Sequence, residues 1–538
     1  MKRKLFILLL VLAVFILILQ SCSTKQSCST EQEENKIIET DASKTSEDNM
    51  EDNIETEISA TEAIPVVTEQ PFIDPSTIYE YQAEEARRFG GVKIGKSIKG
   101  FTGSGYLEGF ANDGDYCAFD VEIEVSGFYD LNFISVGIGS YKENYVVING
   151  ETAGVVSVND KVFEDSVIKR IYLEKGENFI ELKKYWGWIA LDKLVITPSK
   201  SIDPEIYSVS AQLINPDADD NAKRLMKYLT DVYGKKILTG QTAQKGISSF
   251  EVKTIYEVTG KYPAVIGFDM IDYSPSRVNN GANSDAVEKA IEFDKKGGIV
   301  TFCWHWNAPE KYITGIWWSA FYTNAAADIN LADIMNGKDP EGYDLLIEDI
   351  DAIAAQLKRL QDAGVPVLWR PLHEASGGWF WWGAAGPEAC KELWILLYDR
   401  LTNHHKLNNL IWLWNGQAAD WYPGDKYVDI IGEDIYAGER VYSPQTDKFL
   451  KAASYIEKER KMVVLSENGT VFDFDLALRD GAMWGFYAVW NGEFVLEKND
   501  KTGYSEKYTE KNILIKAYTH NISVTLEDLP DLKNYALK

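Results

Sequence analysis

Two glutamates stand where apolar, strand-like segments end. Glu374 closes VPVLWRPLHE (365–374), and Glu467 lies near the end of MVVLSENG (462–469). Hydrolysis of a glycosidic bond requires two carboxyl groups, one protonated to assist the leaving oxygen and one ionised to attack or to activate water. A single carboxylate at a strand end is more often a hydrogen-bonded support group. The pair, with aromatic neighbours at both members, favours the catalytic interpretation.

The other predicted strand ends carry related side chains. Two of the five histidines fall there, together with several tryptophans and carboxylates. In chain order the strand ends read Thr239-Gly240-Gln241, Asp269 and Asp272, Trp304-His305-Trp306, His373-Glu374, Trp414-Asn415, Asp434 and Tyr436, Glu467-Asn468, and Trp490-Asn491. Aromatic planes stack on sugar rings, and negative charge stabilises an oxocarbenium-like transition state. The set is therefore typical of a site that hydrolyses glycans.

Eight strand-like segments would position these residues. They are 235–242, 262–272, 297–306, 365–374, 409–416, 428–436, 462–469 and 482–492. Between them lie segments such as DAVEKAIEFDKK and KELWILLYDRL, whose apolar residues recur every three or four positions, as in helices that pack one face on a sheet. Strands that alternate with helices and carry polar residues at their carboxyl ends predict an α/β domain, a (β/α)₈ TIM barrel, in residues 201–538.

An all-β region precedes the predicted barrel. Between Tyr79 and Pro198, short strand-like stretches are separated by Gly, Asn and Asp turns, with no long helical period. This pattern predicts a β-sandwich of the jelly-roll type in residues 76–200. Two globular domains also agree with the length of 538 residues, which is too long for one hydrophobic core.

The N-terminal residues have the features of an export signal. Basic residues at positions 2–4 precede an apolar run, Phe6 to Leu19, that is short for a membrane span of about 20 residues. The following Leu19-Gln20-Ser21-Cys22 resembles a bacterial lipobox. We expect residues 1–22 to act as a lipoprotein signal, with lipidation of Cys22 anchoring the exported protein to a bacterial membrane; an uncleaved membrane anchor is the alternative. Residues 23–75 are rich in Ser, Thr, Glu, Asp and Asn and predict a disordered acidic linker.

The charge and composition of the chain limit the kinds of partner and cofactor that we expect. A net charge of −27 would repel phosphate backbones, so we expect no nucleic-acid partner. The five cysteines include no CxxC pair, which gives little support to a zinc site or a disulfide framework, and we expect no cofactor for catalysis. Aromatic residues make up 12% of the chain, which suits sugar stacking, although a large aromatic core would give the same figure.

One motif is more specific. WRPLHEASGGWFWWG (369–383), together with VDIIGEDIY and LSENG, resembles glycoside hydrolase family 26 over roughly residues 205–520. The best-represented activity of that family is endo-β-1,4-mannanase. The resemblance implies β-mannan as substrate and a retaining double displacement, with Glu374 as acid/base and Glu467 as nucleophile. It also carries the family's substrate-binding positions onto His305, His373, Trp379, Asp434, Tyr436 and Trp490.

Physical roles follow for three of these residues. We expect Tyr436 to donate a hydrogen bond to Glu467, His373 to orient sugar hydroxyls, and Trp490 to form a stacking floor beneath the sugar at the cleavage point. Asn491 departs from the pattern, because some mannanases of the family carry Arg there. The distal subsite, and with it endo or exo action, is therefore left open.

The β-rich region has a resemblance of its own. YQAEEA (81–86) and WGWIALDKLVI (186–196) are similar to carbohydrate-binding modules of family 35. The resemblance implies a structural calcium ion held by Gln82, Glu84 and Asp192, hard oxygen ligands that meet because the first and last strands pair. Ordinary polar residues of an edge strand are the alternative. Trp188, together with Tyr185, is the expected sugar-stacking residue of the module.

Two other functions stay open. The family also contains β-1,3-xylanases and mixed-linkage β-glucanases, and mannan is favoured only because the HEASGGWFWWG loop looks mannanase-like. The other function, from a different class, is a surface lipoprotein that captures glycan without cutting it. Two intact catalytic-type glutamates argue against that alternative.

Overall fold

The computed structural model describes residues 73–498 and 500–537. The predicted signal segment with Cys22, and the linker as far as residue 72, lie outside the described residues. Within the described part of the chain, every helix is too short or too polar to cross a membrane.

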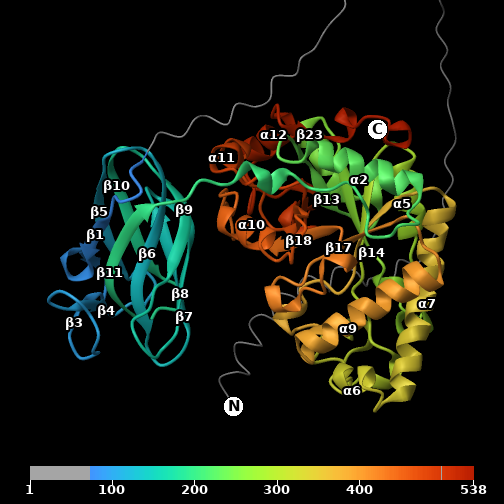
Figure 1. Ribbon diagram of the computed structural model, residues 1–538, viewed down its shortest axis with the longest axis horizontal. Helices are drawn as coiled ribbons and strands as arrows, with labels where there is room; N and C mark the ends of the chain where they lie inside the picture. The colour runs from blue at the N-terminus through green and yellow to red at the C-terminus, as the bar shows by residue number, and fades with distance from the viewer. Residues whose placement is uncertain (1–72, 499, 538) are drawn as a thin grey trace, which may run out of the picture. The chain divides into compact units, whose positions relative to one another are not determined.

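The N-terminal domain is a sandwich of two antiparallel sheets (Figure 1). One sheet has the strand order β3-β4-β11-β6-β9, with β1 also paired to β11, and the other has the order β2-β5-β10-β7-β8. The strands are β1 (Tyr79–Gln82), β2 (Arg87–Phe89), β3 (Lys93–Gly95), β4 (Tyr106–Glu108), β5 (Tyr116–Ile123), β6 (Gly127–Gly137), β7 (Lys142–Ile148), β8 (Glu151–Val158), β9 (Val167–Leu173), β10 (Gly176–Lys184) and β11 (Ile189–Pro198). The prediction of an all-β sandwich is confirmed.

Alternation along the strands builds the sandwich core. In β10, Asn178, Ile180 and Leu182 are buried, while Phe179 between them is exposed on the outer face. This two-residue period is that of a sheet with one face in the core and one face in water. The first and last strands pair, as expected, with Gln82 opposite Lys193.

The C-terminal domain is a closed barrel of eight parallel strands in sequential order. The strands are β13 (Gly240–Thr242), β14 (Val265–Asp269), β15 (Ile299–Cys303), β16 (Val367–Arg370), β17 (Leu410–Trp414), β18 (Ile430–Ile435), β19 (Met462–Asn468) and β20 (Tyr487–Val489). Strands β14, β15 and β17 are buried at every residue, as parallel strands covered on both faces are. The predicted TIM barrel is confirmed, and its strands are shorter than the predicted segments.

The first predicted strand differs from expectation. Instead of one strand over 235–242, β12 (Ile237–Leu238) pairs with the C-terminal β23 (Ser523–Val524), and only β13 belongs to the barrel. Thr239 lies at the break and donates its hydroxyl to the carbonyl of Val524 at 3.0 Å. Beside it, a Cβ at Gly240 would lie 2.1 Å from the carbonyl oxygen of Tyr487, so this close strand contact requires glycine. Outside the barrel, β21 (Leu496–Glu497) pairs with β22 (Asp500–Tyr504).

Helices enclose the barrel strands (Figure 1). They are α2 (Asp220–Val232), α3 (Phe250–Thr259), α4 (Pro275–Asn279), α5 (Ala286–Asp294), α6 (Leu331–Met335), α7 (Pro340–Asp362), α8 (Trp381–Ala384), α9 (Pro387–Tyr398), α10 (Thr446–Ala453), α11 (Phe474–Asp480) and α12 (Lys511–Thr519). Helix α7 shows why the sequence folds this way: Asp339 caps its N-terminus and Pro340 opens its first turn. Its buried Leu346, Ile350 and Ile353 recur every three or four residues.

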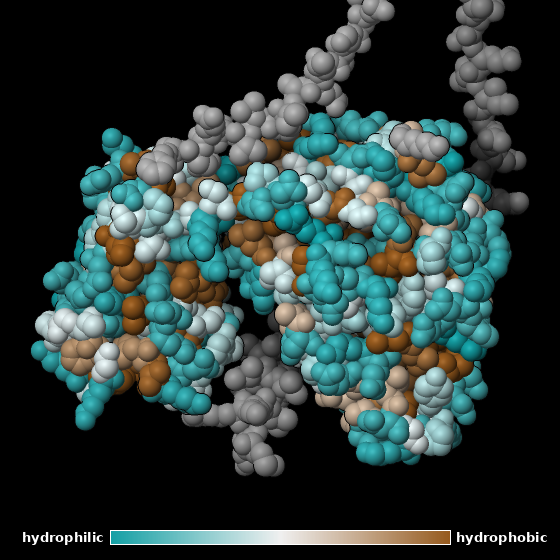
Figure 2. All heavy atoms as spheres, viewed as in Figure 1, coloured by the Kyte–Doolittle hydropathy of each residue, from teal (hydrophilic) through white to brown (hydrophobic). Residues whose placement is uncertain are grey.

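Much of the aromatic content belongs to the core. Seven tryptophans are less than 2% exposed: Trp304, Trp306, Trp369, Trp381, Trp382, Trp412 and Trp484. Trp304 and Trp306 stack on each other at 4.1 Å, and Trp414 is also buried, so these strand-end tryptophans are not sugar platforms. For them the alternative of an aromatic core is correct. Figure 2 shows a mainly hydrophilic face with small, separate hydrophobic patches.

Candidate active site

The two predicted catalytic glutamates meet at the carboxyl end of the barrel. Glu374 follows β16, the fourth strand, and Glu467 lies in β19, the seventh. With Asp434 of β18, they place carboxylate oxygens within 4.8 Å of one another. Enzymes that invert configuration separate the two groups by about 6.5–9.5 Å to seat a water molecule, whereas retaining enzymes place them about 5–5.5 Å apart. The observed spacing has the geometry of the retaining class.

The backbone at Glu374 is unusual. Glu374 and Leu372 both adopt left-handed conformations, with φ of 53° and 51°, which non-glycine residues rarely occupy. The Glu374 amide donates to the carbonyl of Asn415 at 2.8 Å, and the indole of Trp379 donates to Glu374 Oε2 at 3.0 Å. Strained residues persist where their surroundings over-determine them, and they concentrate at functional sites. These contacts fix the direction of the Glu374 carboxyl group.

Burial sets the protonation of Glu374. Removal of the carboxyl group from water, followed by the negative charge of Glu467, raises the pKa of Glu374 to about 7. A carboxyl group with that pKa retains its proton near neutral pH to a large extent, which is the property that a general acid requires.

Glu467 is held by two donors. The Tyr436 hydroxyl donates to Oε1, and Arg370 Nη2 donates to Oε2 at 2.8 Å. Arg370 also donates from Nη1 to Asp434 Oδ2 at 2.6 Å, and Ser466 donates to Asp434 Oδ1 at 2.7 Å. With both oxygens accepting hydrogen bonds, Glu467 is arranged as an ionised carboxylate.

Arg370 is a site residue that the sequence analysis missed. It lies within WRPLHE, which served only as part of the motif that resembles the family. A signal was available, because Arg370 interrupts an apolar barrel strand and is only 4% exposed, and arginine is almost never buried without an acidic partner. A buried arginine in β16 therefore predicts a carboxylate on a facing strand.

The two histidines form a hydrogen-bonded pair. His305 Nδ1 lies 2.6 Å from Asp269 Oδ2, and His305 Nε2 lies 3.2 Å from His373 Nε2. Burial lowers the pKa of His305, but the charge of Asp269 and its hydrogen bond outweigh burial, and the pKa is raised. Burial and then the charge of His305 hold the pKa of His373 well below its usual range. The proton shared by the pair therefore resides on His305, and His373 accepts.

Three aromatic side chains complete the surroundings. Trp379 is 47% exposed and Tyr436 is 45% exposed, although the Tyr436 hydroxyl is held at Glu467. The ring of Trp490, which follows β20, lies 6.0 Å from that of His305. The amide of Trp490 donates to the carbonyl of Asn468 at 2.8 Å, which ties it to the strand that carries Glu467. The structure thus gathers the predicted substrate-binding residues of the barrel around the glutamate pair.

The predicted calcium ligands converge on one loop of the sandwich. The Thr102 hydroxyl lies 3.2 Å from Gln82 Oε1 and 3.0 Å from Asp192 Oδ2, so both side chains meet at one group. The amide of Ser104 donates to Glu84 Oε1. Glu84 Oε2 is buried and has no hydrogen-bond partner among the described residues. An all-oxygen donor set with an unpartnered carboxylate oxygen fits a Ca²⁺ ion.

Trp188 lies in the tight turn between β10 and β11. It is 56% exposed, its φ is 52°, and its amide donates to the carbonyl of Phe110 at 2.8 Å. At the neighbouring Gly187, a Cβ would lie 1.9 Å from the same carbonyl oxygen. The turn therefore holds the indole outward on a fixed backbone.

A (β/α)₈ barrel that carries a close carboxyl pair at the carboxyl ends of its strands, one member protonated and one ionised, defines a glycoside hydrolase. Comparison with known families agrees with this class. Residues 214–518 match glycosyl hydrolase family 26, and the chain belongs to this family. Residues 79–199 match the family 35 carbohydrate binding module, which identifies the N-terminal sandwich.

Similar proteins match most of this chain. The mannan endo-1,4-beta-mannosidase of Thermothelomyces thermophilus is 42% identical over 85% of this chain and 92% of its own length. The mannan endo-1,4-beta-mannosidase B of Piromyces sp. is 38% identical over 84% of this chain and 77% of its own. Among solved structures, the GH26-CBM35 beta-(1,4)-mannanase of Podospora anserina gives a TM-score of 0.58 at 38% identity and covers 85% of this chain and 99% of its own.

Proposed function

We propose that this protein is an endo-β-1,4-mannanase that cleaves internal bonds of mannan, galactomannan or glucomannan with retention of configuration. The spacing of Glu374 and Glu467, within 4.8 Å, is the observation that carries the mechanism. The choice of mannan is supported by the names of the relatives, which are mannan endo-1,4-beta-mannosidases over most of both chains.

The first step forms a covalent intermediate. Glu467 attacks the anomeric carbon as the bond to the leaving oxygen breaks, and Glu374 gives its proton to that oxygen. The products are a shortened chain with a free hydroxyl and a glycosyl ester on Glu467. Trp490 offers a ring face on which the sugar at the cleavage point can stack.

The second step releases the sugar. Water attacks the anomeric carbon, Glu374 takes a proton from that water, and the Glu467 carboxylate leaves. Esterification removes the negative charge of Glu467, which is the second cause of the raised pKa of Glu374. The pKa of Glu374 therefore falls in the intermediate, so that the acid of the first step becomes a better base for the second.

The surrounding residues position these groups. Tyr436 and Arg370 hold the two oxygens of Glu467, so that the carboxylate meets the sugar in one orientation. His305 and His373 bond to each other through their Nε2 atoms at 3.2 Å, so a sugar hydroxyl that binds to either ring would replace this contact. Asp269 fixes the ring orientation of His305.

Release of reducing sugars from galactomannan, β-1,3-xylan and barley glucan tests the assignment. We expect galactomannan to be cleaved fastest, with internal cuts that lower its viscosity early. A preference for β-1,3-xylan or barley glucan would change the assigned substrate but not the mechanism. If no reducing sugar were released from any of the three, a protein that only binds glycan would be favoured.

Two variants test the roles of the glutamates. Glu467→Ala should abolish turnover of every substrate. Glu374→Ala should still react with substrates that have a good leaving group, because such groups need no proton, and azide should then yield a β-glycosyl azide. An α-configured product would overturn the retaining mechanism.

We propose that the module grips polysaccharide through Trp188 and that Gln82, Glu84 and Asp192 would hold a structural Ca²⁺ ion. The ion would brace loop 102–104 with the first and last strands. Replacement of Trp188 by Ala should lower activity on insoluble mannan severalfold and leave hydrolysis of mannopentaose unchanged, because tethering raises only the local concentration of polymer.

Chelation of calcium should lower the melting temperature of the wild type and leave that of Glu84→Gln unchanged. A wild-type melting temperature that chelation does not alter would argue against the calcium site.

We also propose export and lipid anchoring, supported by the basic and apolar N-terminal sequence and by Leu19-Gln20-Ser21-Cys22. Cys22→Ala should release the full-length protein from the surface of the producing bacterium. Continued retention of that variant in membranes would favour an uncleaved anchor.

A further inference from the structure

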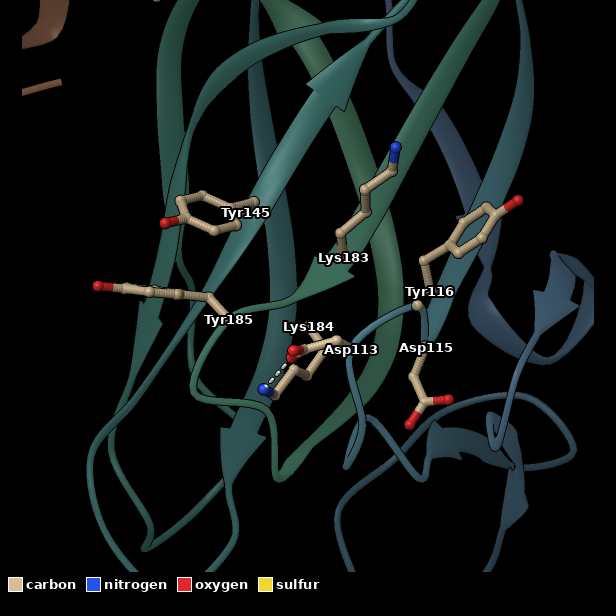
Figure 3. A pocket seen from close by; sticks show the side chains of 8 residues that line it. Asp113, Asp115, Tyr116, Tyr145, Lys183, Lys184 and Tyr185 are labelled. Carbon is tan, nitrogen blue, oxygen red and sulfur yellow. Dashed lines mark hydrogen bonds and ion pairs between the residues drawn. The ribbon is translucent and has the colours of Figure 1, made fainter. Parts of the chain in front are cut away.

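The sandwich domain has a pocket that does not include Trp188. It opens on the outer face of the sheet β2-β5-β10-β7-β8, has a volume of about 470 Å³, and is lined by Asp113, Tyr116, Tyr145, Lys183, Lys184 and Tyr185 (Figure 3). Small-molecule sites are usually about 300–1,000 Å³. The pocket is therefore large enough for a ligand.

Aromatic rings flank the pocket on two sides. Figure 3 shows Tyr145 and Tyr185 on one side of Lys183 and Tyr116 on the other. The Tyr145 and Tyr185 rings lie 4.5 Å apart, and the two side chains are 36% and 41% exposed. Tyr116 stacks on Phe89 at 4.2 Å with an angle of 6° between the rings. Rings that are braced by neighbours lose little entropy when a flat apolar surface stacks on them.

The charges inside the pocket are balanced. Two lysines, Lys183 and Lys184, and two aspartates, Asp113 and Asp115, line it; Lys184 pairs with Asp113 at 2.6 Å, and Lys183 pairs at 2.8 Å with Glu181 beside the pocket. Each ammonium group keeps further N–H donors, and each carboxylate keeps acceptor sites, so the pairs offer both halves of a hydrogen bond to a hydroxyl. No excess of positive charge favours an anionic ligand. This combination of ring faces and paired donors and acceptors fits a neutral pyranose.

The rim of the pocket is fixed in advance. Asp115, which also lines the pocket, accepts hydrogen bonds from the amides of Gly91, Ala111 and Asn112 at 2.6 to 2.9 Å. These bonds hold the loop that carries Asp113 against the sheet. A preformed rim lowers the ordering cost of binding.

We propose that this pocket is a second glycan-binding site of the module and that it binds a stretch of neutral hexopyranose chain; Trp188 does not line it, and Tyr185, which was expected to act with Trp188, belongs to the pocket instead. The identity of the polymer, β-mannan, rests on the function proposed above. Two sites on one small domain raise the retention of long chains by avidity and do nothing for short ones.

The test uses full-length protein with Glu467→Gln, which removes hydrolysis, in native gels cast with galactomannan. Tyr145→Ala and Tyr116→Ala are the test variants. Phe179→Ala is the matched control, because Phe179 is an aromatic residue on the same outer face that is 40% exposed and lies outside the pocket. Each test variant should weaken retention about three- to tenfold, as expected for loss of one stacking ring. Tyr145→Ser removes the same ring with a different replacement. The melting temperatures of all variants show whether a loss of retention comes from lost binding or from lost folding.

Several outcomes would overturn the proposal. They are unchanged retention of both test variants, an equal loss with Phe179→Ala, and stronger retention on polygalacturonate than on galactomannan. Hydrolysis assays on the same variants with Glu467 restored keep the two proposals apart. If the wild type cleaves mannan and both test variants are retained as strongly as the wild type, only the proposal of a second binding site is refuted. If the wild type binds galactomannan through the pocket but cleaves only glucan, only the mannanase assignment is refuted.

Discussion

The loss of charge on Glu467 in the glycosyl-enzyme should move the pKa of Glu374 by a measurable amount. Two unit charges no more than 4.8 Å apart at an effective dielectric constant of about 20 interact by at least about 3.5 kcal/mol, or about 2.5 pKa units. The whole rise at Glu374 is from 4.5 to about 7, and burial contributes more of it than Glu467 does. Glu467 is thus the second cause of the rise, and Arg370 and Trp379 act against it, so we expect the pKa of Glu374 to fall below 7 when Glu467 loses its charge.

Two pH profiles separate the states. With mannopentaose, the alkaline limb of kcat/KM reports Glu374 as the acid of the free enzyme and should lie near pH 7. With a dinitrophenyl β-mannobioside, the first step needs no acid and release of the sugar limits the rate. The acidic limb of kcat then reports Glu374 as the base of the intermediate and should lie at a lower pH than the alkaline limb of kcat/KM.

If the alkaline limb of kcat/KM and the acidic limb of kcat lay at the same pH, the charge of Glu467 would contribute nothing to the pKa of Glu374, and the predicted shift would be refuted. The control is Glu374→Gln, in which the acidic limb should vanish and azide should restore turnover of the activated substrate. An acidic limb that persists in this variant would belong to another group.

Three further perturbations follow from the site. Glu374→Gln should stabilise the protein by about 1–2 kcal/mol at pH 8 and not at pH 4, because a raised folded-state pKa makes the native carboxyl group destabilising as pH rises from 4.5 through 7; denaturant unfolding at both pH values measures this. Arg370→Met should cost about 3–5 kcal/mol of stability, because it leaves two buried carboxylates without their shared cation, and a stability equal to wild type would exclude that pairing. Asp269→Asn should lower kcat/KM about 10- to 100-fold by removing the charged partner of His305, and should shift the pH profile, whereas a uniform loss at all pH values would indicate only a packing role.

Local sequence carried much of the fold. Apolar runs of strand length, each followed by a polar residue, located all eight barrel strands, because burial on both faces leaves a continuous apolar signature. The break between β12 and β13 had no such signal. It depends on a strand at Ser523–Val524, far along the chain, and pairing over that separation leaves no local periodicity.

Part of the active site could also be predicted from the positions of residues along the barrel strands. Strand ends meet at one mouth, so Glu374 and Glu467 could be paired from their positions alone. The bridge from Arg370 to Asp434 and Glu467 could not, because it depends on which side chains turn toward one another across three strands. Trp304 and Trp306 belonged to the strand-end set whose aromatic character suits sugar stacking, but both side chains are buried in the core.

These two tryptophans flank His305 in the chain and restrict its backbone. The indole of Trp304 donates to Ser274 at 3.0 Å and that of Trp306 donates to Asp349 at 2.7 Å, so both rings are fixed on either side of His305 in the chain. Asp349 lies in α7, and burial raises its pKa to about 7, an electrostatic cost that the single indole donor offsets only in part. The stacked indoles flank His305 in the chain and Asp269 holds its ring, so His305 meets His373 in one fixed arrangement, with their Nε2 atoms 3.2 Å apart.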